Sequence, residues 1–345
     1  MSAVHDLVDW KFAVRVGRKL ASDGPVVTRA EAAAAVAELR ADAARSTGLV
    51  REFTGLVAPE NTAPVLVVDR GGWVQANADG FATLLAPVAD RLTAKRAAGA
   101  VAGAATRKIA GAEVGGLLGF LSSKVLGQFD PFTAPHGRLL LIAPNVVHIE
   151  RELDVDPTDF RLWVCLHEET HRVQFTANPW LRDHLMEQVS AIAEMTDTGS
   201  LFDDLAAKVG ELVKGEGATG SLADLVSSPE QREVIDRVTA VMSLLEGHAD
   251  VVMDGVGPSV IPSVETIRAK FGERRKGVGT LDRLLRRLLG IDAKMAQYRD
   301  GAVFVRHVVD AVGMERFNTV WTSPETLPLR SEIHDPGAWI ARVRP

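Results

Sequence analysis

Two histidines and a glutamate near the middle of the chain have the types and spacing that could hold a metal ion. The stretch His167-Glu168-Glu169-Thr170-His171 has the pattern HExxH. On a helix, residues four positions apart lie on one face, so His167 and His171 could direct both imidazoles at one ion. Glu168 would lie beside that ion, where its carboxylate could take a proton from a water molecule. Such a short pattern also occurs by chance among surface and core histidines, so the surrounding sequence must decide.

The sequence around the pattern predicts a buried helix. Asp156 is typical of an N-cap, Pro157 suits the first helical position, and Asn178-Pro179 should end the helix. Apolar side chains lie nearly all round residues 160–166, which indicates burial. Histidines and a carboxylate in a buried helix need partners, and a metal ion would supply them. The single cysteine, Cys165, excludes an internal disulfide and is expected to be a small core residue.

A second long, apolar helix supplies candidates for the remaining ligand. It should begin at the capping box formed by Ser228 and Gln231. A catalytic zinc usually has three protein ligands and an open position, and Glu246 is the preferred third ligand because an unpaired buried carboxylate would be costly. Asp250, one turn further on, could accept the free N–H of a ligating histidine as an outer partner.

Other assignments stay open at this point. Three other residues could be the third ligand, namely His248, Glu187 and Glu194. Alternatively, Glu246 and Asp250 could pair with arginines such as Arg274 or Arg275. That alternative would explain the two acids, but it leaves the two histidines unexplained.

Length and composition exclude several classes of protein. The chain has 345 residues, of which 46% are hydrophobic and 24% charged, a normal balance for a globular protein. The formal net charge of −6 gives no electrostatic footprint for nucleic acid. The most apolar stretch, residues 97–120, is interrupted by charged residues, so no membrane span is expected, and the N-terminus lacks the apolar core of a signal peptide. We therefore expect a cytoplasmic protein.

The expected fold is α+β and predominantly helical, with a short sheet and an added helical N-terminal part. We divide the chain into a mainly helical N-terminal lobe, residues 1–130, and a metal-binding lobe, residues 131–345. Strands are predicted at residues 64–69 and at 138–143, and the first of them should be followed by a turn and a second short strand at 73–74. The strand at 138–143 should offer a free edge to an extended substrate backbone. The GxGxxG match at residues 215–220 follows no strand, so we interpret it as a connector and expect no dinucleotide.

Five blocks of the sequence are distinctive: GQFDPF, LLLIAPN, FRLWVCLHEETHRVQF, LLEGHADVVMD and, after Lys294, QYRDG. Together they resemble the zincin-like metallopeptidase family, some of whose members are associated with deazaflavin-coenzyme biosynthesis. The resemblance covers about residues 10–317, and the HExxH pattern does not depart from it. It implies a largely helical zincin-like fold and a zinc ion (Zn²⁺) held by His167, His171 and Glu246, the arrangement of the glutamate-type zincins. It does not supply a substrate.

The leading hypothesis is a zinc-dependent peptidase or amide hydrolase in which Glu168 activates a water molecule bound to zinc. Tyr298, the single tyrosine, and His248 are the candidates for donating a hydrogen bond to the oxyanion, although a tyrosine bonded to backbone is as good an interpretation of Tyr298. One alternative is a catalytically silent binding or scaffold protein that keeps a structural metal. Another is a hydrolase of small metabolite amides, which a closed pocket would favour.

Overall fold

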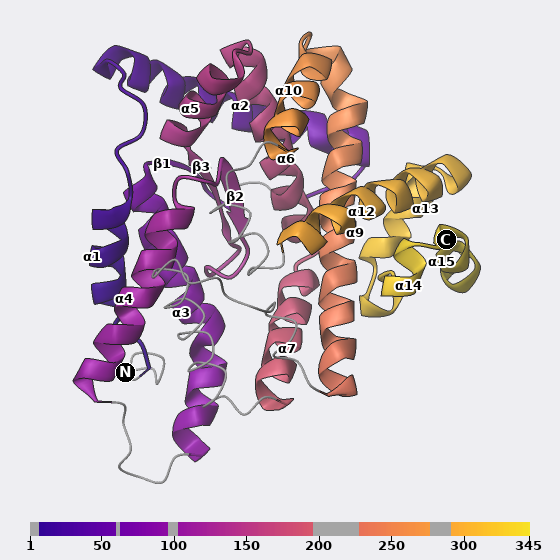
Figure 1. Ribbon diagram of the computed structural model, residues 1–345. Helices are drawn as coiled ribbons and strands as arrows, with labels where there is room; N and C mark the ends of the chain where they lie inside the picture. Colours follow the sequence, from indigo (N-terminus) through magenta and orange to yellow (C-terminus); the bar gives the residue numbers. More distant parts are fainter. Residues whose placement is uncertain (1–6, 60–62, 96–102, 196–227, 277–290) are drawn as a thin grey trace.

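Helices form most of the molecule, and they surround one small sheet (Figure 1). The computed structural model describes residues 7–59, 63–95, 103–195, 228–276 and 291–345. The sheet lies between a layer of helices from the N-terminal part of the chain and the long helices of the second half of the chain. The prediction of a predominantly helical α+β fold is therefore confirmed.

The sheet has three strands: β1 (Val65–Val68), β2 (Gly127–Asp130) and β3 (Arg138–Ile142). Their order is β1-β3-β2, with β1 parallel and β2 antiparallel to β3. The prediction of a free edge on the strand at 138–143 was wrong, because β3 is the central strand and its apolar residues are buried on both faces. The edge strand beside the HExxH helix is β2, whose sequence alone does not predict a strand.

One layer on the sheet consists of α1 (Trp10–Leu20), α3 (Arg70–Lys95) and α4 (Ala104–Leu121). α1 and α4 pack with their backbones close together because three glycines of α4 face α1; a Cβ at Gly115 would lie 2.4 Å from the carbonyl oxygen of Ala13. The turn and second strand expected after β1 do not form. Instead, the Asp69 carboxylate accepts a hydrogen bond from the Gly72 amide at 2.6 Å, and α3 begins there.

The larger core lies on the other side of the sheet. It is built on α6 (Pro157–Ala177), which contains the HExxH pattern, and on α9 (Pro229–Val260). Both begin as predicted: Asp156 caps α6, and Ser228 with Gln231 forms the capping box of α9. The elements packed around them are α2 (Arg29–Thr54), α5 (Ala143–Leu153), α7 (Trp180–Met195), α10 (Val264–Lys276) and α12 (Ile291–Val312).

The C-terminal segment folds into short helices. They are α13 (Met314–Phe317), η3 (Asn318–Trp321), η4 (Pro324–Thr326), α14 (Arg330–Ile333) and α15 (Pro336–Val343). Trp339 of α15 is fully buried against Phe304 of α12, which anchors this segment to the core.

The division expected between residues 130 and 131 falls between β2 and β3, which pair in one sheet. In addition, α2 of the first segment packs directly on α6 of the second. The connector predicted at residues 215–220 lies outside the described residues. In the part of the chain that the structure describes, no helix combines the length and apolar character needed to cross a membrane.

Candidate metal centre

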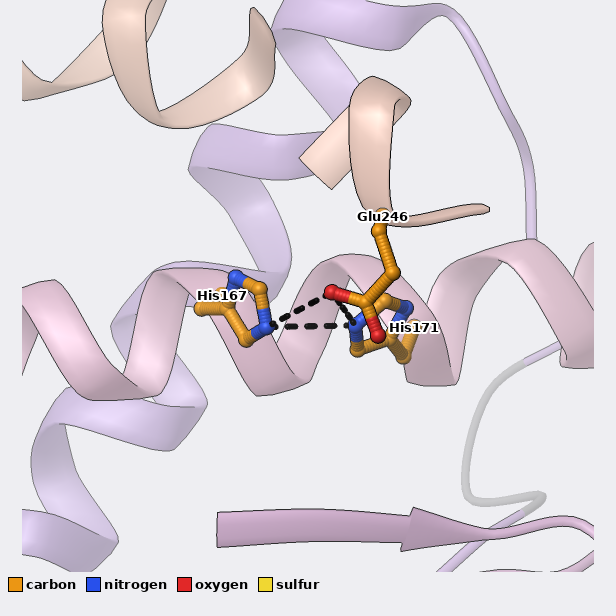
Figure 2. Close-up of side chains that lie close together, drawn as sticks. All are labelled: His167, His171 and Glu246. Atoms are coloured by element: carbon orange, nitrogen blue, oxygen red, sulfur yellow. Dashed lines mark hydrogen bonds and ion pairs between the residues drawn. The ribbon is translucent and has the colours of Figure 1, made fainter. Parts of the chain in front are cut away.

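Helices α6 and α9 bring His167, His171 and Glu246 together (Figure 2). Glu246 Oε2 lies 3.6 Å from His167 Nε2 and 3.7 Å from His171 Nε2, and the two Nε2 atoms are 3.3 Å apart. One potential ligand atom from each of the three residues lies within 4.8 Å of the other two. The helical spacing that motivated the prediction therefore does place both imidazoles on one face, opposite a carboxylate from the second helix.

The outer nitrogens of the two imidazoles face protein atoms. His171 Nδ1 lies 3.0 Å from Oε1 of Gln174, and His167 Nδ1 lies 3.3 Å from the sulfur of Met253. Because Nδ1 of each ring is directed away from the centre, Nε2 of each ring is directed towards it. This is the orientation in which Nε2 can act as a ligand.

Glu168 is almost completely buried, with 8% of its surface exposed. Its side chain lies directly against Gly127 of β2, where a Cβ would be only 2.3 Å from Glu168 Cγ. Burial raises the pKa of Glu168 to about 8, with His171 opposing the shift and Glu246 adding to it. A carboxyl with such a pKa can both accept and release a proton near neutral pH.

The centre concentrates charge in a buried place. Burial alone would lower the pKa of His171, but the carboxylates of Glu246 and Glu168 raise it to about 9 in the metal-free protein. Near neutral pH, where Glu168 is itself protonated, the proton on His171 thus balances chiefly the carboxylate of Glu246 when no cation is present. A divalent cation would supply the same compensation with a larger charge.

A cavity of about 400 Å³ opens onto the three residues and Glu168. One part of its wall is β2 itself, together with Asn77 of α3. Trp73 donates to Gln128 at 2.8 Å, and Gln128 donates to Asn77 at 3.0 Å, so this polar part is held by hydrogen bonds. The remaining wall is mostly apolar and comes from several helices and the segment after β2: Phe81, Leu84, Phe132, Phe175, Leu185, Met242 and Leu245.

His248 does not line this cavity. Its imidazole is fully buried on the far side of Gln174, stacked on Phe317 and edge-on to Trp321. Burial, followed by the effect of His171, lowers the pKa of His248 to about 3, so the ring is neutral. Since two positions along a helix correspond to nearly opposite faces, His248 is directed away from the centre when Glu246 is directed towards it. From this position, His248 is not suited to be the third metal ligand or to donate a hydrogen bond to an oxyanion in the cavity.

The remaining candidates lie as follows. Glu187 is exposed on α7. Arg274 pairs with Glu152 at 3.0 Å rather than with Glu246 or Asp250 of α9. The backbone carbonyl of Asp250 accepts from Arg268, and its role as an outer partner of the histidines stays a prediction. The side chains of three residues considered earlier lie outside those that the structure describes: Tyr298, Glu194 and Arg275. Cys165 is fully buried as expected.

Sequence reasoning missed two residues of the site, Gln174 and Gly127. Gln174 follows His171 by three positions and therefore shares its helix face, so this spacing was a usable signal. Gly127 could not have been found, because its importance depends on a contact between β2 and α6 that no local pattern reveals.

The donor set fits a zinc ion. Two imidazole nitrogens and one carboxylate oxygen are a known catalytic zinc set, and the cavity beside them leaves room for a water molecule or substrate.

Comparisons with known proteins agree with the geometry. The model of a family described as zincin-like metallopeptidase matches residues 8–340. A solved structure from Chloroflexus aurantiacus, described as that of a candidate hydrolase with a novel fold, is similar to this chain with a TM-score of 0.73 and 32% sequence identity. That similarity covers 98% of this chain and 99% of the other. No curated protein matches.

Proposed function

The chain belongs to the zincin-like metallopeptidase family, and from this premise we propose that it is a zinc-dependent hydrolase of peptide or amide bonds. The observation that carries the proposal is the convergence of His167, His171 and Glu246 at a cavity that also contains the buried carboxyl of Glu168. These four residues supply a metal-binding set and an acid–base group.

His167, His171 and Glu246 would hold the zinc ion. Zinc bound there would polarise a carbonyl group and lower the pKa of water towards about 7. The chain's own contribution to proton transfer is Glu168, which takes the proton of the attacking water and passes it to the leaving amine. In the metal-free protein, burial raises the pKa of Glu168 to about 8 and so stabilises the protonated form, which is the form that acts as the acid.

The cavity supports a substrate with an extended backbone. β2 is an edge strand, and all four of its residues line the cavity. An edge strand carries unpaired backbone N–H and C=O groups that can pair with an extended peptide. The aromatic and aliphatic wall opposite would accept apolar side chains of that peptide.

A small amide is the second candidate substrate, and the size of the cavity favours it. A volume of about 400 Å³ lies within the range typical of pockets for small molecules. A panel containing both internally quenched peptides and short N-acyl amides separates the two classes of substrate.

The test compares the wild type with Glu168→Gln and Glu246→Ala. Elemental analysis should find about one zinc per chain in the wild type and in Glu168→Gln, and much less in Glu246→Ala. Hydrolysis should be lost in both variants. Turnover by Glu168→Gln at the wild-type rate would exclude Glu168 as the proton carrier. Wild-type protein that binds zinc but hydrolyses neither class of substrate would favour the binding or scaffold alternative.

A further inference from the structure

The side chain of Gln174 lies at the centre of a hydrogen-bond network that connects the two helices of the metal centre. It is fully buried on α6, one turn after His171. Its Oε1 lies 3.0 Å from His171 Nδ1, and its Nε2 lies 3.0 Å from the backbone carbonyl oxygen of Leu245 and 2.9 Å from His248 Nδ1. Leu245 and His248 belong to α9, on either side of Glu246.

These contacts determine which way the amide of Gln174 points. A backbone carbonyl can only accept a hydrogen bond, so the Gln174 atom facing Leu245 must be the NH₂ group. The second hydrogen of that group then donates to His248 Nδ1, and Oε1 is left facing His171. Because an amide oxygen can only accept, His171 Nδ1 must carry a hydrogen.

The consequence concerns the tautomer of His171. An imidazole that is protonated at Nδ1 and neutral has its lone pair on Nε2, the nitrogen directed at Glu246 and His167. In the reverse arrangement, with the hydrogen on Nε2, a lone pair on Nδ1 would face the lone pairs of the Gln174 oxygen inside a buried site, which is repulsive.

His248 of α9 contacts the amide nitrogen of Gln174. Its Nδ1 accepts from Gln174, so the hydrogen of its neutral ring lies on Nε2, which has no hydrogen-bond partner among the described residues. Leaving a buried N–H unpaired has a cost, and here it accompanies an interaction that holds the glutamine amide in one orientation.

We propose that Gln174 is a positioning residue that fixes His171 as the tautomer able to ligate zinc through Nε2, and that His248 positions Gln174. This inference rests on the proposed metal site. It extends the motif on α6 to HExxHxxQ, and it gives the LEGHAD block of α9 two tasks: Glu246 is a ligand, while Leu245 and His248 orient the residue that orients another ligand.

The first readout is zinc affinity, measured by competition with a chromophoric chelator. Replacing an outer partner of a metal-ligating histidine typically weakens binding by about 10–100-fold. Gln174→Leu should show such a loss. His248→Phe, which keeps an aromatic ring between Phe317 and Trp321, should show a smaller loss because Gln174 retains its bonds to His171 and Leu245.

The second readout is spectroscopic and does not depend on stability. In the zinc-loaded wild type, the Nδ1 hydrogen of His171 should give a slowly exchanging imidazole N–H resonance in ¹⁵N-histidine-labelled protein. That resonance should disappear or exchange rapidly in Gln174→Leu. Asn178→Ala is the matched control, because Asn178 donates to the backbone carbonyl of Gln174 at 2.9 Å and does not touch the side-chain amide. It should leave both readouts unchanged.

The double variant Gln174→Leu/His248→Phe tests the order of action. Since His248 acts through Gln174, the second change should weaken zinc binding no further in the Gln174→Leu background. Wild-type affinity in Gln174→Leu, or a full additional loss from His248→Phe, would overturn the inference while leaving the proposed metal site standing. A wild type that binds no zinc would instead overturn both. Should Gln174→Leu fail to fold, His248→Phe with the N–H resonance still decides, because unchanged affinity and exchange there would overturn the role of His248.

Discussion

Gly127→Ala should reduce turnover strongly while leaving the fold and the metal almost unaffected. A Cβ at residue 127 would lie 2.3 Å from Cγ and 2.6 Å from Cδ of Glu168. Carbon atoms are in comfortable contact at about 3.5 Å, so the carboxyl must withdraw by at least about 1 Å. A displacement of that size at a reacting group costs on the order of 100-fold in rate. The side chain of Glu168 can rotate, so the loss of stability should be only about 1 kcal/mol.

The assay measures kcat/KM on the best substrate from the panel of peptides and amides, together with zinc content and the unfolding midpoint. Gly116→Ala is the control. Gly116 lies on α4, and a Cβ at this position would meet nothing within 4 Å, so the substitution does not disturb Glu168. A Gly127→Ala variant with kcat/KM within twofold of the wild type would refute the argument that β2 sets the position of Glu168. Loss of zinc along with activity would show that the contact supports the whole centre and not Glu168 alone.

Two further predictions concern stability and do not need a substrate. Gly301→Ala should destabilise the protein by about 3 kcal/mol, because its Cβ would lie 1.9 Å from the backbone oxygen of Ser243 and backbone cannot move aside as a side chain can. Thermal or urea unfolding measures the loss, and Gly48→Ala, whose Cβ meets nothing within 4 Å, should be neutral or slightly stabilising. Burial, followed by the charge of Glu38, raises the pKa of Asp42 from 3.8 to about 6, although Arg45 and Arg161 lower it. Asp42→Asn should therefore stabilise the protein by roughly 2 kcal/mol at pH 8, after allowance for solvent screening. The stability of the wild type should therefore fall as pH rises from 4 to 6, since the unfolded chain gives up this proton first, and an advantage of Asp42→Asn that is equal at pH 5 and pH 8 would contradict the assignment.

The features predictable from the sequence are those that depend on neighbours along one helix. The cap at Asp156 and the capping box at Ser228 involve residues three positions apart, so the pattern itself contains the contact. His167 and His171, four positions apart, likewise lie on one face of the same helix. Glu246 could also be singled out, because a carboxylate within a long apolar helix requires a partner, and its partners proved to be the two histidines.

The features that could not be predicted depend on how elements meet. The pair Gly71-Gly72 suggested a turn, but the carboxylate of Asp69 caps a helix there, and the two glycines lie in its first turn. The segment 127–130 contains a glycine, a glutamine and an aspartate and has little strand character of its own. It becomes β2 because β3 offers it an antiparallel partner, and that pairing moves the free edge of the sheet from β3 to β2.

The glycines at the contacts of the metal centre explain why its geometry depends on elements far from the HExxH pattern. On α9, Gly247 follows the ligand Glu246 directly, and a Cβ there would lie 2.1 Å from the backbone carbon of Gly301 on α12. Helices α9 and α12 therefore cross with their backbones in contact, and this contact sets the distance between the two helices. A side chain at either position would push α9 away from α12. Because α9 also packs against α6, this movement would shift α9 relative to α6. Glu246 would then move relative to His171, and the carbonyl of Leu245 would move relative to Gln174. The helix crossing at Gly247 and Gly301 thus acts on the third ligand and on the outer network at once, so a substitution there should weaken zinc binding even though neither glycine contacts a ligand atom.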